Sequence, residues 1–305
     1  MGDELFHRVG DVRIEHQVYN PSYLRARPPI VFFHGTPGSC KSAEVWCEEF
    51  IKLKYPVFAF TRGGYKQSTL GDGYRTFADQ AKRMREVLDD YGVDYAVVYG
   101  VSGGAACALD FCKLYPTVVV GLILESAVLS HYKESRGSLY QRVADKVLYT
   151  SFGQWLYATA LLYIPTVAYY IMLVRYSTMT LRRLGFEVKV IQYDNTIKDR
   201  AYMLINDLMS DKPRPIGYEN DLNELLTDRT GHLAFIPKNT LVLHGTADSE
   251  TPISDTDRVG MVQGYSNVHA VVDGSHVLPL SSRHQYVSDL KIRFLHRILN
   301  YIDHE

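Results

Sequence analysis

Six short runs of apolar, mostly β-branched residues recur along the chain, and each is bounded by residues that favour turns. Runs of this length and composition predict buried strands. They cover residues 30–33, 57–60, 96–99, 118–124, 240–243 and 268–272. When such strands alternate with helices, right-handed crossovers produce a mostly parallel sheet with helices on both faces. We therefore expect an α/β fold.

Helical patterns lie between these runs. Apolar residues repeat at helical spacing over residues 77–91, and Thr76 is placed to cap the start of that helix. A second helix is expected over residues 103–115 and a third over residues 287–302. In folds of this kind, ligands bind beyond the carboxyl ends of the strands. Catalytic residues are expected to follow the strands.

The alternation breaks between Val128 and Pro237, where the pattern is mostly helical. We interpret residues 128–237 as a helical cap inserted into a core made of residues 1–127 and 238–305. The sequence contains no internal repeat, low-complexity tract or flexible linker. The cap is therefore expected to pack directly on the core.

The charge balance and the cysteines restrict the partners and the location. The chain has 33 basic and 34 acidic residues and no block of like charge, which gives no electrostatic reason to expect a nucleic-acid partner. Its four cysteines form no metal-ligand pattern and are too few for a disulfide scaffold, so they favour a reducing compartment. The first residues lack the basic and apolar regions of a secretion signal. We expect a cytoplasmic protein.

The segment Gly100–Gly104 reads Gly-Val-Ser-Gly-Gly and lies between the third predicted strand and the second predicted helix. A G-x-S-x-G sequence in this position is typical of a nucleophile elbow, here with Ser102 as the nucleophile. The glycines are needed because strand and helix approach so closely that a Cβ would clash. The ordinary alternative is a glycine-rich turn whose serine only caps the helix.

Further polar residues follow the other predicted strands. The backbone N–H groups of Thr36, after the first strand, and Gly103 would form a two-donor oxyanion hole. Asp248 follows the fifth strand and His276 the sixth. Glu125 also ends an apolar run and is the alternative acid, although chain order and strand-end position favour Asp248.

Taken together, the chain resembles the α/β-hydrolase superfamily over nearly its whole length, through His34-Gly35, Gly100–Gly104, His244–Asp248 and Gly274–His276. The order Ser, Asp, His is the one found in that superfamily. Relatives with dehalogenase or epoxide-hydrolase activity carry aspartate at the nucleophile position, so a serine implies ester-type chemistry. By this resemblance Ser102 attacks a carbonyl, His276 is the general base, Asp248 orients His276, and neither a metal nor a cofactor is required.

Residues 147–174 contain no charged side chain, a length that would permit a membrane span. A single span would place Ser102 and the other two triad residues on opposite sides of a bilayer, and Pro165 interrupts the stretch. We expect two lid helices with Trp155 and Tyr157 as candidates for an apolar pocket wall. The expected substrate is a small ester or thioester with an uncharged hydrophobic group. Contact of the cap with a membrane surface is a second reading.

Asn220 and Asp221, also in the cap, could reach the active site, and helix capping is the ordinary alternative. Two other functions stay open. An aminopeptidase of the proline-iminopeptidase type would need carboxylates such as Glu219 and Asp221 to hold a free amine. A ligand receptor on the same fold would need no turnover.

Overall fold

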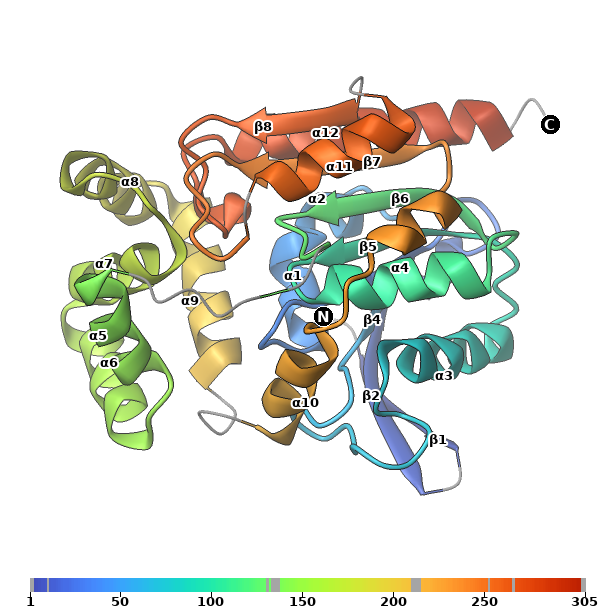
Figure 1. Ribbon diagram of the computed structural model, residues 1–305, viewed down its shortest axis with the longest axis horizontal. Coiled ribbons are helices and arrows are strands. Elements are labelled where there is room, and N and C mark those ends of the chain that lie inside the picture. Colours follow the sequence, from blue (N-terminus) through green and yellow to red (C-terminus); the bar gives the residue numbers. More distant parts are fainter. Residues whose placement is uncertain are drawn as a thin grey trace.

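An eight-stranded sheet forms the centre of the protein in the computed structural model, which describes residues 3–9, 11–129, 132, 138–209, 215–251, 253–264 and 267–302 (Figure 1). The strand order is β1-β2-β4-β3-β5-β6-β7-β8. The strands are β1 (Asp3–Val9), β2 (Val12–Tyr19), β3 (Ile30–Phe33), β4 (Val57–Phe60), β5 (Ala96–Val101), β6 (Val119–Glu125), β7 (Thr240–Gly245) and β8 (Val268–Val271). Strands β3 to β8 pair in parallel, whereas β1 and β2 form an antiparallel hairpin against β4. The predicted mostly parallel α/β sheet is confirmed.

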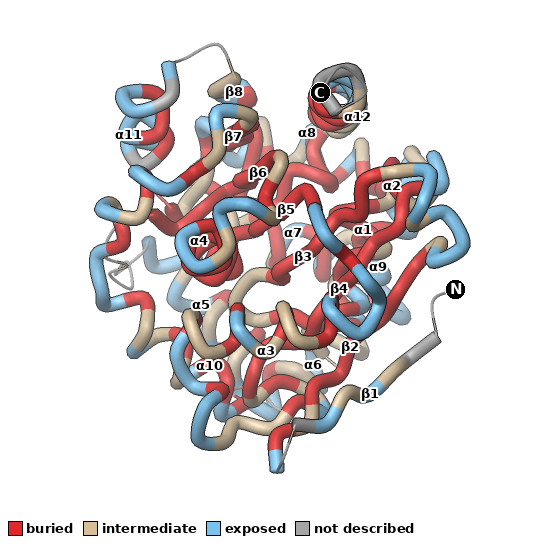
Figure 2. Tube along the Cα trace, turned by 90° about the vertical axis from the view of Figure 1, so that its right-hand side faces the viewer, coloured by how far each residue is buried: buried red, intermediate tan, exposed pale blue. Residues whose placement is uncertain are grey.

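Helices cover both faces of this sheet. Figure 2 shows α3 (Phe77–Asp90), α4 (Gly104–Leu114) and α11 (Ser254–Gln263) on one side, and α1 (Ala43–Trp46), α2 (Glu48–Lys52) and α12 (His284–Ile302) on the other. The N-terminus of α3 is capped as predicted, because the Thr76 side chain accepts a hydrogen bond from the N–H of Asp79. Consecutive strand residues point to opposite faces, so Phe32 and Phe33 enter two separate buried clusters. The central strands are therefore buried on both sides.

A helical cap lies between β6 and β7. It contains α5 (Leu139–Leu148), α6 (Ser151–Tyr163), α7 (Pro165–Tyr176), α8 (Leu181–Tyr193) and α9 (Asn195–Met209), and α10 (Ile216–Glu224) follows it. In Figure 1 the cap helices α5 to α8 form one end of the molecule, and α9 lies between them and the core. The uncharged stretch is divided at Pro165, which occupies the first turn of α7. The boundaries at residues 128 and 237 stay a prediction.

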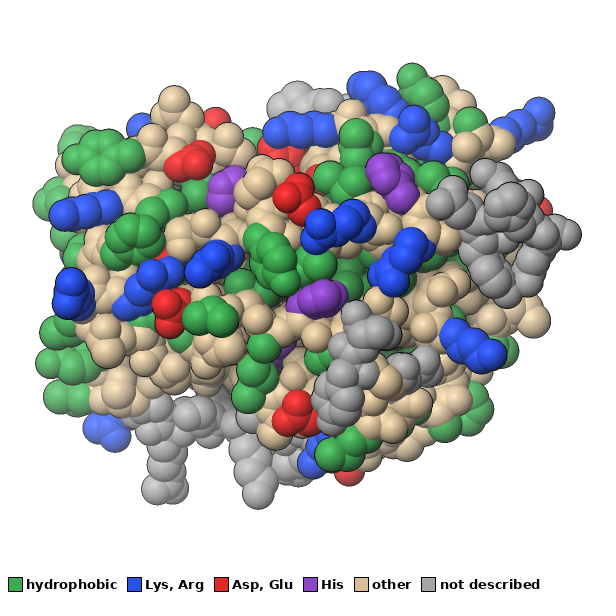
Figure 3. Space-filling view, turned by 90° about the horizontal axis from the view of Figure 1, so that it is seen from above, with side chains coloured by type: hydrophobic (Ala, Val, Ile, Leu, Met, Phe, Trp, Pro, Cys, Tyr) green, Lys and Arg blue, Asp and Glu red, His purple; other side chains and the backbone are tan. Residues whose placement is uncertain are grey.

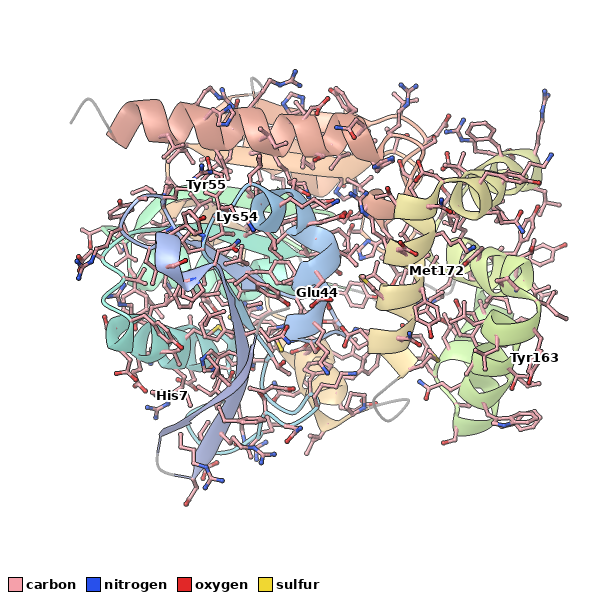
Figure 4. All side chains as sticks on the ribbon, turned by 180° about the vertical axis from the view of Figure 1, so that it is seen from behind. His7, Glu44, Lys54, Tyr55, Tyr163 and Met172 are labelled. Atoms are coloured by element: carbon pink, nitrogen blue, oxygen red, sulfur yellow. The ribbon has the colours of Figure 1, made fainter. Side chains whose placement is uncertain are left out.

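Within the part of the chain that the structure describes, no helix has both the length and the apolar character needed to cross a bilayer. The cap is nevertheless apolar on its outer surface. Phe152, Trp155, Leu162 and Tyr163 are exposed there, and Figure 3 shows apolar side chains gathered at this end of the molecule. Figure 4 shows Tyr163 at the outer edge of the cap, whereas Met172 lies on the side that faces α9. One face of the α6–α7 pair is thus exposed to solvent, whereas the other faces α9.

Candidate active site

The chain turns sharply at Ser102, between the end of β5 and the start of α4. Ser102 has a φ of 51°, in the left-handed region that non-glycine residues seldom adopt. A Cβ on Gly104 would lie 2.2 Å from the carbonyl oxygen of His34, and a Cβ on Gly100 would lie 2.7 Å from the Cα of Ala105. Both glycines are therefore required by the close approach of strand, helix and neighbouring loop.

Three side chains from separate loops meet at this turn. The Nε2 atom of His276 lies 2.9 Å from the Oγ atom of Ser102, and its Nδ1 atom lies 2.8 Å from an Oδ2 atom of Asp248. Both distances are within hydrogen-bond range. When Nδ1 carries a proton and donates it to Asp248, Nε2 can accept the proton of Ser102. This arrangement can activate a serine as a nucleophile.

The surroundings keep Asp248 ionised and make His276 more basic. Burial acts to raise the pKa of Asp248, but the neighbouring His276 and hydrogen bonds to the carboxylate lower that pKa below its ordinary value. The second carboxylate oxygen accepts the N–H groups of Glu250 at 2.7 Å and Thr251 at 3.1 Å. Burial acts to lower the pKa of His276, but the Asp248 carboxylate raises it above the ordinary histidine value. In both cases the attraction between the two residues, together with hydrogen bonds and other neighbouring groups, outweighs desolvation.

The loop after β3 passes directly beside the Ser102 turn. Thr36 and Gly103 are in close contact there, since a Cβ on Gly103 would lie 2.3 Å from the Oγ1 atom of Thr36. Both residues also line one small cavity together with Ser102. The structure thus brings together the two residues whose N–H groups were predicted to form an oxyanion hole, and two donors at this point could stabilise a developing negative charge.

A buried ion pair fixes the position of the loop after β3, which contains Gly35 and Thr36. An Nη1 atom of Arg62 lies 2.6 Å from an Oδ2 atom of Asp221, and neither side chain is exposed to solvent. The other terminal nitrogen of Arg62 donates to the carbonyl oxygen of Gly35 and to Oγ1 of Thr36, both at 2.9 Å. The Thr36 hydroxyl donates to Asp221 at 2.7 Å. Because Asp221 lies on α10, a segment far along the chain fixes the position of the loop.

The end of cap helix α7 contacts the loops that carry Asp248 and His276. The ring of Tyr176 stacks on the imidazole of His276 with centroids 5.9 Å apart, and the Tyr176 carbonyl oxygen accepts the His276 N–H at 2.9 Å. The preceding residue, Arg175, forms an ion pair with Glu250. The sequence carried no signal for these contacts. A cap helix therefore helps to position the imidazole.

A pocket leads from Ser102 to the boundary between core and cap and contains about 790 Å³ of empty space, its open mouth included. Its walls are mostly apolar and come from α1, from cap helices and from the His276 loop: Trp46, Leu148, Tyr157, Met172, Leu204, Ile205, Leu208 and Val277. Two carboxylates also line it. Asp207 accepts the hydroxyl groups of Ser39 at 2.6 Å and Ser42 at 2.7 Å, and Glu250 is paired with Arg175.

The four candidates for substrate binding lie in different places. Tyr157 is buried in the pocket wall, and its hydroxyl donates to the carbonyl oxygen of Ala168 at 3.0 Å. Trp155 is 62% exposed on the outer surface of the cap and does not line the pocket. Asn220 donates to the carbonyl oxygen of Arg75 on the surface, and Asp221 is enclosed by its ion pair. Only Tyr157 is placed to contact a substrate in the pocket.

Glu125, the alternative acid, does not lie beside His276. Its carboxylate contacts the hydroxyl of Tyr99 and lies 3.3 Å from the Nζ atom of Lys291, which also pairs with Glu49 at 2.7 Å. Burial raises the pKa of Glu125 although Lys291 opposes this effect. Glu125 thus pairs with Tyr99 and Lys291 inside the core, whereas Asp248 is the carboxylate that contacts the imidazole of His276.

Glu125→Gln is expected to leave kcat/KM for an ester within about threefold of the parent value. The free energy of unfolding should fall by about 1–3 kcal/mol, because Lys291 loses one of its two buried carboxylate partners. Steady-state kinetics and denaturant titration measure the two quantities, with Asp248→Asn as the matched variant that should lose activity. A large loss of activity in a folded Glu125→Gln protein would contradict the placement of the acid.

Among the described residues, no group of three or more His, Cys, Asp or Glu side chains is arranged to hold a metal ion. Ser102 and His276 are arranged for proton transfer and nucleophilic attack.

Comparison with known proteins is in accord with the fold. A family model described as alpha/beta hydrolase fold matches residues 28–158. A homoserine O-acetyltransferase from Thermus thermophilus is 25% identical over 170 residues, which cover 42% of this chain and 45% of that protein. The chain thus matches less than half the length of this curated relative.

Solved structures are similar over nearly the whole chain. An alpha/beta hydrolase fold protein from Nakamurella multipartita is 21% identical with a TM-score of 0.82, covering 96% of this chain and 99% of that one. An esterase from Rhodococcus sp. ECU1013 is 20% identical with a TM-score of 0.62, covering 96% and 98%. At this level of identity the likeness shows the fold. The chain therefore has the α/β-hydrolase fold, and its residues 28–158 match the model of that family.

Proposed function

We propose that the protein is a serine hydrolase that cleaves a carboxylic ester or thioester with a hydrophobic group through an acyl-enzyme. One observation carries this proposal: Ser102 and His276 of the hydrogen-bonded series Ser102, His276, Asp248 line a largely apolar pocket. The esterases among proteins of similar structure support the same class of reaction. The apolar walls favour an uncharged group, because burial of apolar surface supplies the binding free energy.

In the proposed mechanism, the Oγ atom of Ser102 attacks the carbonyl carbon while its proton moves to Nε2 of His276. The N–H groups of Thr36 and Gly103 stabilise the negative charge on the carbonyl oxygen. When the bond to the alcohol or thiol breaks, the leaving group takes the proton from His276. Water then attacks the acyl-enzyme, gives its proton to His276, and releases the acid and the free serine.

Covalent labelling with a fluorophosphonate probe tests this proposal. The parent protein is expected to gain the mass of one phosphonyl group, and Ser102→Ala should gain none. His276→Ala should react far more slowly, because the serine loses its base. Intact-mass analysis measures the outcome. A folded parent protein that resists even small fluorophosphonates would overturn the hydrolase and favour a receptor that binds without turnover.

The labelling rate should rise with pH, with a midpoint above the ordinary histidine pKa of about 6.5. The reason is that only neutral His276 can take the serine proton, and Asp248 raises the pKa of the imidazole. Protonation at lower pH therefore removes the base, whereas Asp248 stays ionised. Rate measurements across pH give the midpoint, which should fall in Asp248→Asn. A rate that does not change with pH would contradict the role of His276.

Two other activities, peptide cleavage and acyl transfer, differ in how well the observations support them. The aminopeptidase would need a carboxylate free to hold an amine, but Glu219 is exposed, Asp221 is enclosed by Arg62, and the carboxylates that line the pocket are bonded. The partial match to an acetyltransferase favours a second candidate, transfer of the acyl group to an alcohol in place of water. Product analysis with and without added alcohols separates hydrolysis from transfer.

A further inference from the structure

Two cavities meet at Ser102, and their walls differ. The pocket described above, here called the large cavity, contains about 790 Å³ of empty space, and the second, here called the small cavity, contains about 350 Å³ on the same measure. Thr36, Ser102 and Glu250 line both. An ester bound for attack by Ser102 must place its acyl group in one cavity and its alcohol in the other. The inference below rests on the proposed hydrolase function.

The position of His276 distinguishes the two cavities. The leaving oxygen must lie close to Nε2 of His276, because this atom returns the proton when the carbon–oxygen bond breaks. His276 lines the large cavity and is absent from the wall of the small one. Gly103, whose N–H would face the carbonyl oxygen, lines the small cavity instead. The alcohol should therefore extend into the large cavity and the acyl group into the small one.

The walls agree with this assignment. The large cavity presents the apolar side chains of Trp46, Met172 and Leu204, which suit an extended apolar group. The small cavity is enclosed by leucines of the α10 region and by three tyrosines, Tyr132, Tyr149 and Tyr218. Its two charged members, Arg175 and Glu250, are already joined in an ion pair. A long alkyl chain there would have to displace bonded polar groups, whereas a short acyl group would not.

We propose that the protein prefers esters of a short acyl group, such as acetyl or propionyl, with an extended apolar alcohol. The specificity-determining residues are Leu222 on α10, which closes the small cavity, and Leu204 on α9, which lines the large one. Ser102 forms the bond to the short acyl carbon, the bond from that carbon to the alcohol oxygen breaks, and the alcohol leaves with the proton from His276. Water completes the cycle by releasing the short acid.

A pair of isomeric esters tests the orientation directly. Octyl acetate and ethyl octanoate have the same molecular formula. They differ only in which side of the ester carries the long chain: the alcohol side in octyl acetate and the acyl side in ethyl octanoate. The kcat/KM value for octyl acetate is expected to exceed that for ethyl octanoate by roughly tenfold or more. Equal values, or a preference for ethyl octanoate, would overturn the assignment. Phenyl acetate turnover and fluorophosphonate labelling, both lost in Ser102→Ala, show separately whether the proposed hydrolase function itself holds.

Leu222→Ala and Leu204→Ala form a matched pair, because each truncates a half-buried leucine and each lines only one cavity. Leu222→Ala enlarges the small cavity, so kcat/KM should rise for phenyl butyrate relative to phenyl acetate. The preference among acetates of different alcohols should stay the same in this variant. Leu204→Ala should instead weaken the preference for octyl over ethyl acetate. The opposite pattern would show that the acyl and alcohol sites are exchanged, and no change in either variant would show that neither leucine sets specificity.

Discussion

Replacing Ser102 with Ala is expected to lower kcat for ester hydrolysis by about 10⁴- to 10⁶-fold, and His276→Ala should cost a similar factor. The reason is that the Oγ atom of Ser102 and the Nε2 atom of His276, 2.9 Å apart, act in one proton transfer. Removing either atom abolishes the same step. The residual rate would come from the oxyanion hole and from substrate binding. Initial rates with a chromogenic acetate ester measure the effect.

The double variant gives the sharper test. If the two residues act as one unit, Ser102→Ala combined with His276→Ala should be little slower than either single variant. Ser254→Ala and His296→Ala are matched controls on the exposed surface and should retain the parent rate. Additive losses in the double variant, with all proteins shown to be folded by circular dichroism, would mean that the two side chains contribute independently. The proposed mechanism would then be wrong.

Much of the fold could be predicted from the sequence because the central strands are buried on both faces. Strands such as β3 and β5 therefore appear as continuous apolar runs, and their ends lie within two residues of the predicted limits. The hairpin β1–β2 was missed. In β2 the polar residues Arg13, Glu15, His16 and Gln17 leave no continuous apolar run of the kind that marked the other strands, although the structure buries most of this strand.

The candidate site also could be predicted only in part. Ser102, Asp248 and His276 each follow a strand, so chain order and strand ends indicated that they meet. The pocket wall was harder to predict. Trp155 and Tyr157 are two positions apart on α6, a separation that places side chains on opposite sides of a helix. Periodicity in a nearly uniform apolar stretch could not tell which of the two faces the core, and the structure buries Tyr157.

No local sequence pattern predicted the contact between Arg62 and Asp221. Its members are distant in sequence, and helix capping was the ordinary explanation for an aspartate at that position. In the structure, Asp221 accepts hydrogen bonds from the hydroxyl groups of Thr36 and Tyr65, both at 2.7 Å, in addition to the contact with Arg62. The side chain of Thr36 is thus held by two charged groups, while its N–H can face the substrate.

Asp221→Ala is expected to lower the free energy of unfolding by about 3–5 kcal/mol, because it leaves the guanidinium of Arg62 buried without its partner. Denaturant titration measures this change. Glu86→Ala is the matched control, because it removes the carboxylate of a surface pair with Arg83 and should cost less than about 1 kcal/mol. A loss in Asp221→Ala as small as the control would show that solvent reaches Arg62 and that the pair is not a buried anchor.

The double replacement Arg62→Met with Asp221→Leu separates stability from activity. The apolar side chains should recover part of the lost stability, because no buried charge remains. They cannot donate to the carbonyl oxygen of Gly35 or hold the hydroxyl of Thr36, so the predicted oxyanion loop loses its anchor. We expect kcat to stay about 10- to 100-fold below the parent value with KM little changed, because the oxyanion hole acts on the transition state more than on bound substrate. A stable double variant with the parent kcat would show that the ion pair supports the fold and does not position Thr36.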